Sequence, residues 1–208
     1  YPASKAAAEQ RVLAADGKSL RTCALRPHLI WGPGDPHLVP RLLERARAGT
    51  LRQVGDGTNR VDLTYVDNAA AAHIRALDRL GPDGPARGRA YFVGDPEPVL
   101  LWEWIDTLLT RCGLPRVRKR VPHRTARIVG WLCETAYRVL RLPGEPPMTR
   151  FLADHLAVCH YFDQSQARKE LDYRPHVDNG TGLDRLVRWL RDSGRIPRPE
   201  NRPGNENR

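Results

Sequence analysis

Helix-like and strand-like segments alternate along most of this sequence, and that order limits the fold more than any other feature. Residues 2–16, PASKAAAEQRVLAAD, are rich in strong helix formers, and Gly17 follows as a helix-ending residue. The apolar centre of SLRTCALRP is typical of a buried strand that ends at Pro27. A strand followed by a helix returns in RAYFVGD and LLWEWIDTLLTRCG. The alternation predicts an α/β protein with a largely parallel sheet.

The middle and the end of the chain predict further elements of the same kinds. HLVPRLLERARAG predicts a helix closed by Gly49, and LRQVGDGTNRVDLTYV predicts two short strands around the turn GDGTN. The second strand runs directly into the helix DNAAAAHIRALDRL, which we expect Asp67 to cap with its carboxylate. Asp163 is expected to cap a short helix in the same way.

Residues 124–142, RTARIVGWLCETAYRVLRL, have apolar side chains at helical spacing with Arg on the remaining face. We expect this helix to pack its apolar face on a neighbouring element, as amphipathic helices usually do. The alternative is peripheral contact with a membrane, because apolar side chains beside Arg suit an anionic bilayer surface. No apolar run approaches the roughly 20 residues that span a bilayer.

The formal net charge of +10 comes from 34 Lys and Arg against 24 Asp and Glu. Because the Arg residues are spread out and often adjoin acids, as in RLLERARAG, we expect a solvated surface and no nucleic-acid partner. The four cysteines include no CxxC pair, which favours a reduced, cytoplasmic setting. His155 and His160 are the closest histidine pair, and with no third ligand beside them we expect no metal site.

The first five residues hold a chemically suggestive pair. Tyr1 and Lys5 are four positions apart, which places both on one face of a helix. A phenol has a pKa of about 10, and a nearby cation lowers that pKa by favouring the phenolate. The pair is therefore a candidate acid/base unit. The spacing also arises by chance in many helices, so its meaning depends on the segments that follow.

Four motifs in order carry a resemblance to a known family. Tyr-x-x-x-Lys opens an Ala-rich helix, a buried strand ends in LRP, IWGPGD follows, and GDGTNRVDLTYVDNAAAAHI comes next. Their order and spacing resemble the extended short-chain dehydrogenases, over residues 1–193. The resemblance implies the C-terminal portion of a Rossmann-type, doubly wound parallel sheet plus a small mixed substrate-binding domain.

The family's N-terminal signature is missing from the sequence. Family members begin with a strand–glycine-loop–helix unit that holds the dinucleotide pyrophosphate. No GxGxxG or GxxGxxG follows a strand here, and the Ser or Thr that normally precedes the Tyr is also missing. We therefore expect the chain to be the C-terminal part of a longer enzyme, and to bind no dinucleotide tightly by itself.

The resemblance also assigns roles to residues. In the family the Tyr exchanges a proton with the substrate hydroxyl or carbonyl, while the Lys lowers the Tyr pKa and hydrogen-bonds the nicotinamide ribose. Applied to this sequence, the resemblance implies an enzyme that uses NAD or NADP, with Tyr1 and Lys5 as catalytic residues. It further implies cofactor contacts from Tyr1, Lys5, Pro27 and His28, and substrate contacts from His28, Trp31 and Asn59.

The segment GDGTNRVDLTYVDN separates two branches of the family. Sugar-nucleotide epimerases and dehydratases tend to carry an Arg directly before the Asp, where a guanidinium can bind a diphosphate. Here Val61 precedes Asp62, although Arg60 is adjacent. This segment and LRPHLIWGPGDPHLVPRLLERARAG resemble the 3-beta-hydroxysteroid dehydrogenase branch, in particular its sterol-4-alpha-carboxylate and 2-alkyl-3-oxoalkanoate forms.

That branch implies an oxidoreductase that interconverts a 3-hydroxy and a 3-oxo group on a lipophilic acid or steroid-like substrate. A homodimer and peripheral membrane contact are further expectations. The alternatives are a sugar-nucleotide epimerase or dehydratase of the same superfamily, or a non-catalytic dinucleotide-binding protein. Four tryptophans are candidates to wall an apolar pocket, although core packing is the default for each: Trp31, Trp102, Trp104 and Trp131.

The expected domain organisation follows from the resemblance. Residues 1–95 would form the C-terminal part of the dinucleotide-binding domain, with substrate-side segments interleaved at about 36–62. Residues 96–193 would supply mainly the substrate-binding domain and closing helices. The polar residues 194–208 would form a flexible tail.

Overall fold

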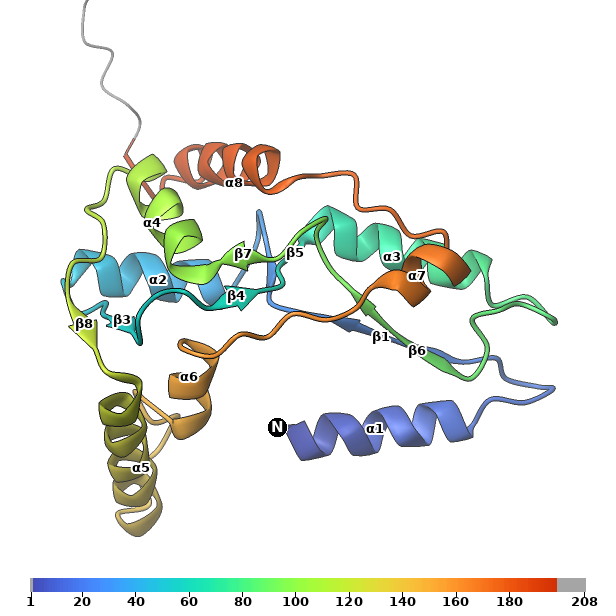
Figure 1. Ribbon diagram of the computed structural model, residues 1–208, viewed down its shortest axis with the longest axis horizontal. Coiled ribbons are helices and arrows are strands. Elements are labelled where there is room, and N and C mark those ends of the chain that lie inside the picture. The colour runs from blue at the N-terminus through green and yellow to red at the C-terminus, as the bar shows by residue number, and fades with distance from the viewer. Residues whose placement is uncertain (1, 198–208) are drawn as a thin grey trace, which may run out of the picture.

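Figure 1 shows the computed structural model, which describes residues 2–197. Its helices are α1 (Pro2–Ala14), α2 (Leu38–Arg47), α3 (Val66–Asp78), α4 (Leu101–Arg111), α5 (His123–Val139), α6 (Arg150–His155), α7 (Ser165–Glu170) and α8 (Asn179–Asp192). Its strands are β1 (Cys23–Pro27), β2 (Ile30–Trp31), β3 (Gln53–Val54), β4 (Arg60–Val61), β5 (Thr64–Tyr65), β6 (Arg89–Val93), β7 (Val99–Leu100) and β8 (Arg120–Val121).

The five-residue strands β1 and β6 form a parallel pair. Their register runs from Cys23 opposite Arg89 to Pro27 opposite Val93. Figure 1 shows α1 on one side of this pair and α3 with α7 on the other. Helices on both faces of a parallel pair are the arrangement of a doubly wound sheet, so the predicted fold class is confirmed.

The remaining strand pairs have two residues in each strand and join distant parts of the chain. β2 pairs with β5 and β3 with β8, both parallel, while β4 pairs with β7 antiparallel. An isolated parallel bridge joins Val61 to His160. The β2–β5 pairing holds residues 30–31 against residues 64–65, and the other pairings hold residues 53–61 against residues within 99–160.

The buried apolar side chains form two clusters. The smaller cluster includes Tyr91, Leu171 and Tyr173 and lies where β6, α3 and α7 meet. The larger cluster joins α2, α4 and α8 around Trp31. The Trp31 ring packs edge-on against Tyr65 at 5.1 Å and Trp104 at 5.0 Å between ring centroids. The predicted division into a dinucleotide-binding part and a substrate-binding part stays a prediction.

A glycine of α8 is required by the larger cluster. A Cβ at Gly182 would lie 2.7 Å from the Trp31 ring and 2.9 Å from the Tyr65 ring, well inside van der Waals contact. Only a residue without a side chain lets α8 approach these rings so closely.

Three of the four tryptophans considered as pocket walls pack in the core as expected by default. Trp31, Trp102 and Trp104 are each at most 5% exposed, whereas Trp131 is 52% exposed.

The expectation that Asp67 caps α3 is wrong. The helix begins at Val66, so Asp67 lies inside the first turn, and its carboxylate accepts a hydrogen bond from Arg185 at 3.0 Å. The amide of Tyr65, directly before the helix, instead donates to the buried carboxylate of Asp95. Asp163 lies one position before the N-cap residue of α7, Gln164, but its carboxylate accepts from the Ser165 amide at 2.8 Å and so satisfies a free amide at the start of the helix.

The expectation that α5 packs its apolar face on a neighbour is met only at Ala126 and Gly130, which are buried. Most of its large apolar side chains are exposed, because α5 and α6 extend away from the rest of the protein as a pair (Figure 1). None of the helices within residues 2–197 combines the length and apolar character needed to cross a bilayer. Most of the predicted tail, residues 198–208, lies outside the described part of the chain.

Candidate functional site

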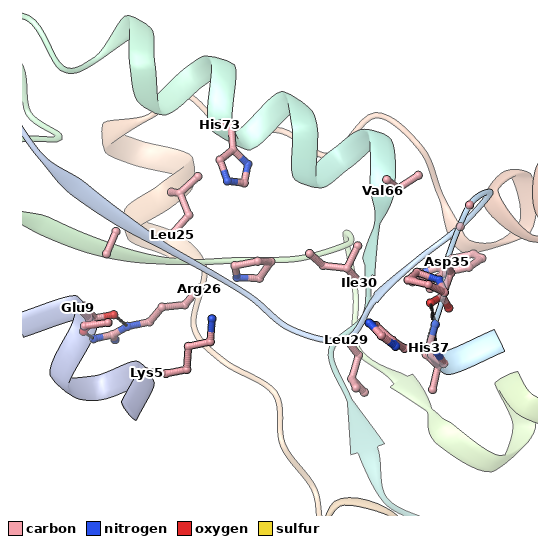
Figure 2. A pocket seen from close by; sticks show the side chains of 18 of the residues that line it. Lys5, Glu9, Leu25, Arg26, Leu29, Ile30, Asp35, His37, Val66 and His73 are labelled. Atoms are coloured by element: carbon pink, nitrogen blue, oxygen red, sulfur yellow. Dashed lines mark hydrogen bonds and ion pairs between the residues drawn. The ribbon is translucent and has the colours of Figure 1, made fainter. Parts of the chain in front are cut away.

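A cleft of about 1060 Å³ opens between α1, β1 and the loop that follows β2 (Figure 2). Lys5, Glu9 and Val12 line it from α1, and residues 23–27 line it from β1. Val66 and His73 close it from α3. The wall is mostly apolar with a few charged groups, which is the composition of sites that bind small organic molecules.

Lys5 lies on α1 and extends toward β1 in Figure 2. One turn further along the helix, Glu9 accepts two hydrogen bonds from Arg26 of β1, at 2.7 Å from Nε and 2.5 Å from Nη2. This bidentate ion pair holds α1 against β1. The hydrogen bonds from the Arg26 guanidinium lower the pKa of Glu9. The pair therefore fixes the helix face that carries Lys5 relative to Pro27.

The segment Gly32–Pro36 shapes the far end of the cleft. Gly32 has φ +142, and a Cβ there would lie 2.7 Å from Val66, so this turn needs glycine. The Asp35 carboxylate accepts hydrogen bonds from the amides of His37, Leu38 and Val39 at 2.7, 3.1 and 2.8 Å. Those amides have no hydrogen-bond partner within α2, so the Asp35 carboxylate stabilises the start of this helix.

The structure brings only some of the sequence-predicted site residues to this cleft. Lys5 and Pro27 line it, whereas Tyr1 lies outside the described residues. Trp31 also borders the cleft, but its side chain is fully buried and its indole N–H donates to Asp95 at 3.1 Å. His28 and Asn59 are not among the lining residues of the cleft.

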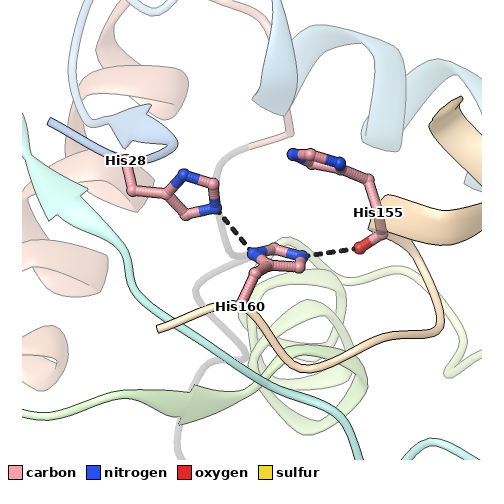
Figure 3. A group of neighbouring side chains, drawn as sticks. All are labelled: His28, His155 and His160. Atoms are coloured by element: carbon pink, nitrogen blue, oxygen red, sulfur yellow. Dashed lines mark hydrogen bonds between the residues drawn. The ribbon is translucent and has the colours of Figure 1, made fainter. Parts of the chain in front are cut away.

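His28 lies instead beside two histidines that are distant in sequence (Figure 3). Its Nε2 atom is 2.6 Å from Nδ1 of His160, and the ring of His155 stacks on that of His160 with 4.6 Å between centroids. The sequence-based reasoning that no third ligand accompanies His155 and His160 is therefore wrong. Sequence spacing misses the cluster because the β1–β2 connection supplies its third member.

The pKa values of this cluster are shifted by burial. Burial, reinforced by the neighbouring rings of His160 and His155, lowers the pKa of His28 to about 4. Burial, and then the neighbouring ring of His160, also lower the pKa of His155. Both rings are consequently neutral near pH 7, with lone pairs on nitrogen that can accept a proton or bind a metal ion.

Asn59 lies in the loop before β4 and is 2% exposed. Its side-chain nitrogen and oxygen have no hydrogen-bond partner among the described residues. A buried amide without partners is costly, which makes Asn59 a candidate to bind a polar group that enters from outside this part of the chain. Its predicted contact with substrate stays a prediction.

The arrangement of elements defines a Rossmann-type α/β protein, and solved structures share it. The crystal structure of gox2253 matches with a TM-score of 0.64 at 23% identity, over 91% of this chain and 55% of that one. DesIV, a dTDP-glucose 4,6-dehydratase from Streptomyces venezuelae crystallised with NAD and TYD, matches with a TM-score of 0.63 at 24% identity, over 92% and 51%. At these identities the likeness shows the fold.

The chain belongs to the 3-beta hydroxysteroid dehydrogenase/isomerase family, whose model matches residues 1–122. A 2-alkyl-3-oxoalkanoate reductase from Stenotrophomonas maltophilia is 53% identical over 186 residues, which cover 89% of this chain and 56% of the relative. A decarboxylating sterol-4-alpha-carboxylate 3-dehydrogenase from Schizosaccharomyces pombe is 36% identical over 195 residues, covering 91% and 56%. The chain thus spans about half the length of the curated relatives it matches.

Proposed function

We propose that the protein is an NAD(P)-dependent oxidoreductase that interconverts a 3-hydroxy and a 3-oxo group on a lipophilic acid or steroid-like substrate. Family membership and the activities for which the similar relatives are named support this proposal. The structural observation that carries it is the cleft that Lys5 of α1 and Pro27 of β1 line together.

The cleft residues fit the nicotinamide end of a dinucleotide. The side chains between α1 and β1 give an apolar surface for a flat ring, and Lys5 is a cation that can donate hydrogen bonds to ribose hydroxyls. No glycine motif in the sequence follows a strand and opens a helix, so pyrophosphate binding is not assigned to these residues. A bound nicotinamide would supply the hydride chemistry.

Tyr1 and Lys5 supply the proton chemistry in this proposal. The phenol of Tyr1, four residues before Lys5 in the sequence, gives a proton to the substrate oxygen during reduction and takes it back during oxidation. The cation of Lys5 favours the phenolate form, which brings the phenol closer to the range where it exchanges protons near neutral pH. The Glu9–Arg26 pair acts only by holding α1 in position.

The residues around β4 favour a lipophilic acid over a sugar nucleotide. Val61, which stands where an Arg would bind a diphosphate, is fully buried in the larger hydrophobic cluster. The adjacent Arg60 is exposed and lies over the Tyr161 ring at 5.9 Å. A sugar nucleotide would therefore lack its guanidinium partner at Val61, and His28 stays a candidate partner for a substrate carboxylate.

Peripheral membrane contact and a homodimer belong to the same proposal. The exposed apolar residues of the α5–α6 pair lie among exposed arginines, a combination that suits an anionic bilayer surface. The exposed apolar residues of α5, of α6 and of the segment between them are Ile128, Val129, Trp131, Leu132, Val139, Leu140, Leu142 and Phe151. The arginines are Arg124, Arg127, Arg138, Arg141 and Arg150.

The deciding assay uses the polypeptide translated from the complete reading frame that encodes this chain. We expect NAD(P)H oxidation with a 2-alkyl-3-oxo acid or NAD(P) reduction with a 3-hydroxysteroid. Turnover of a UDP- or dTDP-sugar with activity on neither lipid would reverse the branch choice. Dinucleotide binding without turnover of any of these substrates would favour the non-catalytic alternative.

A further inference from the structure

Three histidines from separate segments converge at one point of the molecule. One ligand nitrogen from each of His28, His155 and His160 lies within 4.8 Å of the others (Figure 3). We propose that these three side chains form a binding site for a divalent transition-metal ion of the Zn²⁺ type. The inference rests on this geometry alone, so it holds or fails independently of the proposed oxidoreductase activity.

The backbone at His28 is fixed on both sides. The fully buried Thr64 accepts from the His28 amide at 3.1 Å through its hydroxyl oxygen, and the same hydroxyl donates to the His28 carbonyl at 2.8 Å. The next residue, Leu29, has φ +44, a left-handed conformation that is unfavourable for a residue with a side chain. Strained backbone conformations often occur at binding sites.

Backbone hydrogen bonds also fix the position of His160. Its amide donates to the Arg60 carbonyl at 2.9 Å, and its carbonyl accepts from the Asp62 amide at 3.1 Å, which together pin it to β4. Its Nε2 lies 2.8 Å from the His155 carbonyl oxygen. A carbonyl only accepts hydrogen bonds, so Nε2 carries a hydrogen, and Nδ1, which faces His28, is the ring nitrogen that can offer a lone pair.

This tautomer is the one that a metal ligand needs. Histidines that bind metals commonly donate their second ring N–H to a backbone carbonyl, which orients the ring toward the ion. In the structure, Nε2 of His28 donates to Nδ1 of His160 across 2.6 Å. An ion would replace that shared hydrogen when the neutral His28 moves its proton from Nε2 to Nδ1, and no net proton is released.

The spacing requires only a small adjustment. Nitrogen ligands of a tetrahedral Zn²⁺ ion, each about 2.0–2.1 Å from the metal, are about 3.3 Å apart. The two nitrogens at 2.6 Å must therefore separate by less than about 1 Å, which side-chain rotation can supply. The ligand nitrogen of His155, at the end of α6, lies within 4.8 Å of the other two and must also reach this spacing by side-chain rotation. The Phe151 ring packs against the His155 ring at 4.3 Å between centroids.

The nature and number of the ligands select the ion. Imidazole nitrogens suit Zn²⁺, Cu²⁺ and Ni²⁺, whereas Mg²⁺ and Ca²⁺ prefer oxygen. Three protein ligands leave a fourth coordination position for water or another small ligand. A surface pocket of about 400 Å³ bordered by His155 and His160 gives access to the cluster. Asp62, whose amide donates to the His160 carbonyl at 3.1 Å, carries a buried carboxylate that would offset part of the ion's charge.

The test is metal binding by the untagged protein after treatment with a chelator. We expect isothermal titration calorimetry with Zn²⁺ to show one ion per chain, and Co²⁺ to give the intense visible absorption of a tetrahedral site. His155→Ala and His160→Ala should each weaken Zn²⁺ binding at least about tenfold. The matched control His73→Ala removes a histidine of α3, whose ring bonds the Ala69 carbonyl, and should bind Zn²⁺ like the parent protein.

The size-conserving variants His155→Gln and His160→Gln, checked by circular dichroism, separate lost ligands from lost folding. Zn²⁺ should raise the unfolding temperature of the parent and of His73→Ala but not of these two variants. The proposal is overturned if the parent shows no saturable binding. It is overturned equally if folded His155→Gln and His160→Gln proteins retain the parent affinity, or if His73→Ala loses it to the same extent.

Discussion

The side-chain amide of Asn68 donates to the carboxylate of Asp95 at 2.7 Å, and both side chains are buried. The same carboxylate also accepts from the Tyr65 amide and the Trp31 indole. Asn68 in turn donates to the Val177 carbonyl at 2.8 Å and accepts from the Val177 amide at 3.1 Å. One buried polar network therefore joins the start of α3 to β2, to the end of β6 and to the segment before α8.

Replacing Asn68 by Leu should destabilise the protein strongly. The change leaves the Asp95 carboxylate and the backbone at Val177 short of partners in a buried site, which costs about 3 kcal/mol of unfolding free energy. The control Asp67→Asn removes an ion pair with Arg185 in which both side chains are about half exposed, and should cost less than about 1 kcal/mol. Urea unfolding measures both, and equal midpoints for the two variants would contradict the role given to the network.

The Glu9–Arg26 pair should make stability depend on pH in the acid range. Because Arg26 lowers the pKa of Glu9 from its ordinary value of 4.5, the stabilisation is complete above 4.5 and is lost as pH falls through the lower folded-state pKa. At neutral pH, Glu9→Gln should lose less than about 1 kcal/mol, because the pair is partly exposed. Unfolding free energies of parent and variant should converge as the pH falls below 4.5 and through the lowered folded-state pKa of Glu9. A difference that widens on acidification would refute this assignment.

Lys5→Met should reduce catalysis in the polypeptide from the complete reading frame. Loss of the cation that favours the Tyr1 phenolate should lower kcat/KM for a 2-alkyl-3-oxo acid by about 10²–10⁴-fold. The control Lys18→Met removes an exposed lysine in the turn after α1 and should leave the rate unchanged. Steady-state assays with NAD(P)H compare the two, and a Lys5→Met enzyme as fast as the Lys18→Met enzyme would exclude the proposed role.

The α5 face should bind anionic vesicles. Leu132→Ser combined with Trp131→Ser removes two side chains that are 53% and 52% exposed, and should weaken co-sedimentation with phosphatidylserine-containing vesicles severalfold. The control pair Ile74→Ser and Leu77→Ser removes apolar side chains of α3 that are 62% and 71% exposed, away from the arginines of α5. Equal losses in the two double variants, or no vesicle binding by the parent, would argue against a membrane contact at α5.

The sequence was sufficient to predict the long elements because their patterns are local. The Ala-rich α1 and the apolar strand before Pro27 follow from helix propensity and from the apolar run. The order and spacing of four motifs, of which Tyr1 and Lys5 form the first, likewise indicated the family. The two-residue strands, such as β3 and β8, exist only through pairing with distant segments, which local patterns do not encode.

The histidine cluster and the exposed face of α5 show the same limit. His28 and His160 meet because the Val61–His160 bridge and the Thr64 hydroxyl bring their backbones together, and neither contact has a signal in sequence spacing. Periodicity identified α5 as amphipathic, but periodicity does not say whether an apolar face is covered. Only the position of α5 at the edge of the fold decides that.

The strand pairs also determine the order in which a nascent chain can fold. β2 can close on β5 once Tyr65 has left the ribosome, but β1 waits for β6 at Val93 and β3 waits for β8 at Val121. Pairings between segments so far apart slow folding, because each one closes a long loop before it gains any contacts. The strand β1 therefore lacks its β6 partner until Val93 has been synthesised, so this pairing belongs to the later steps of folding.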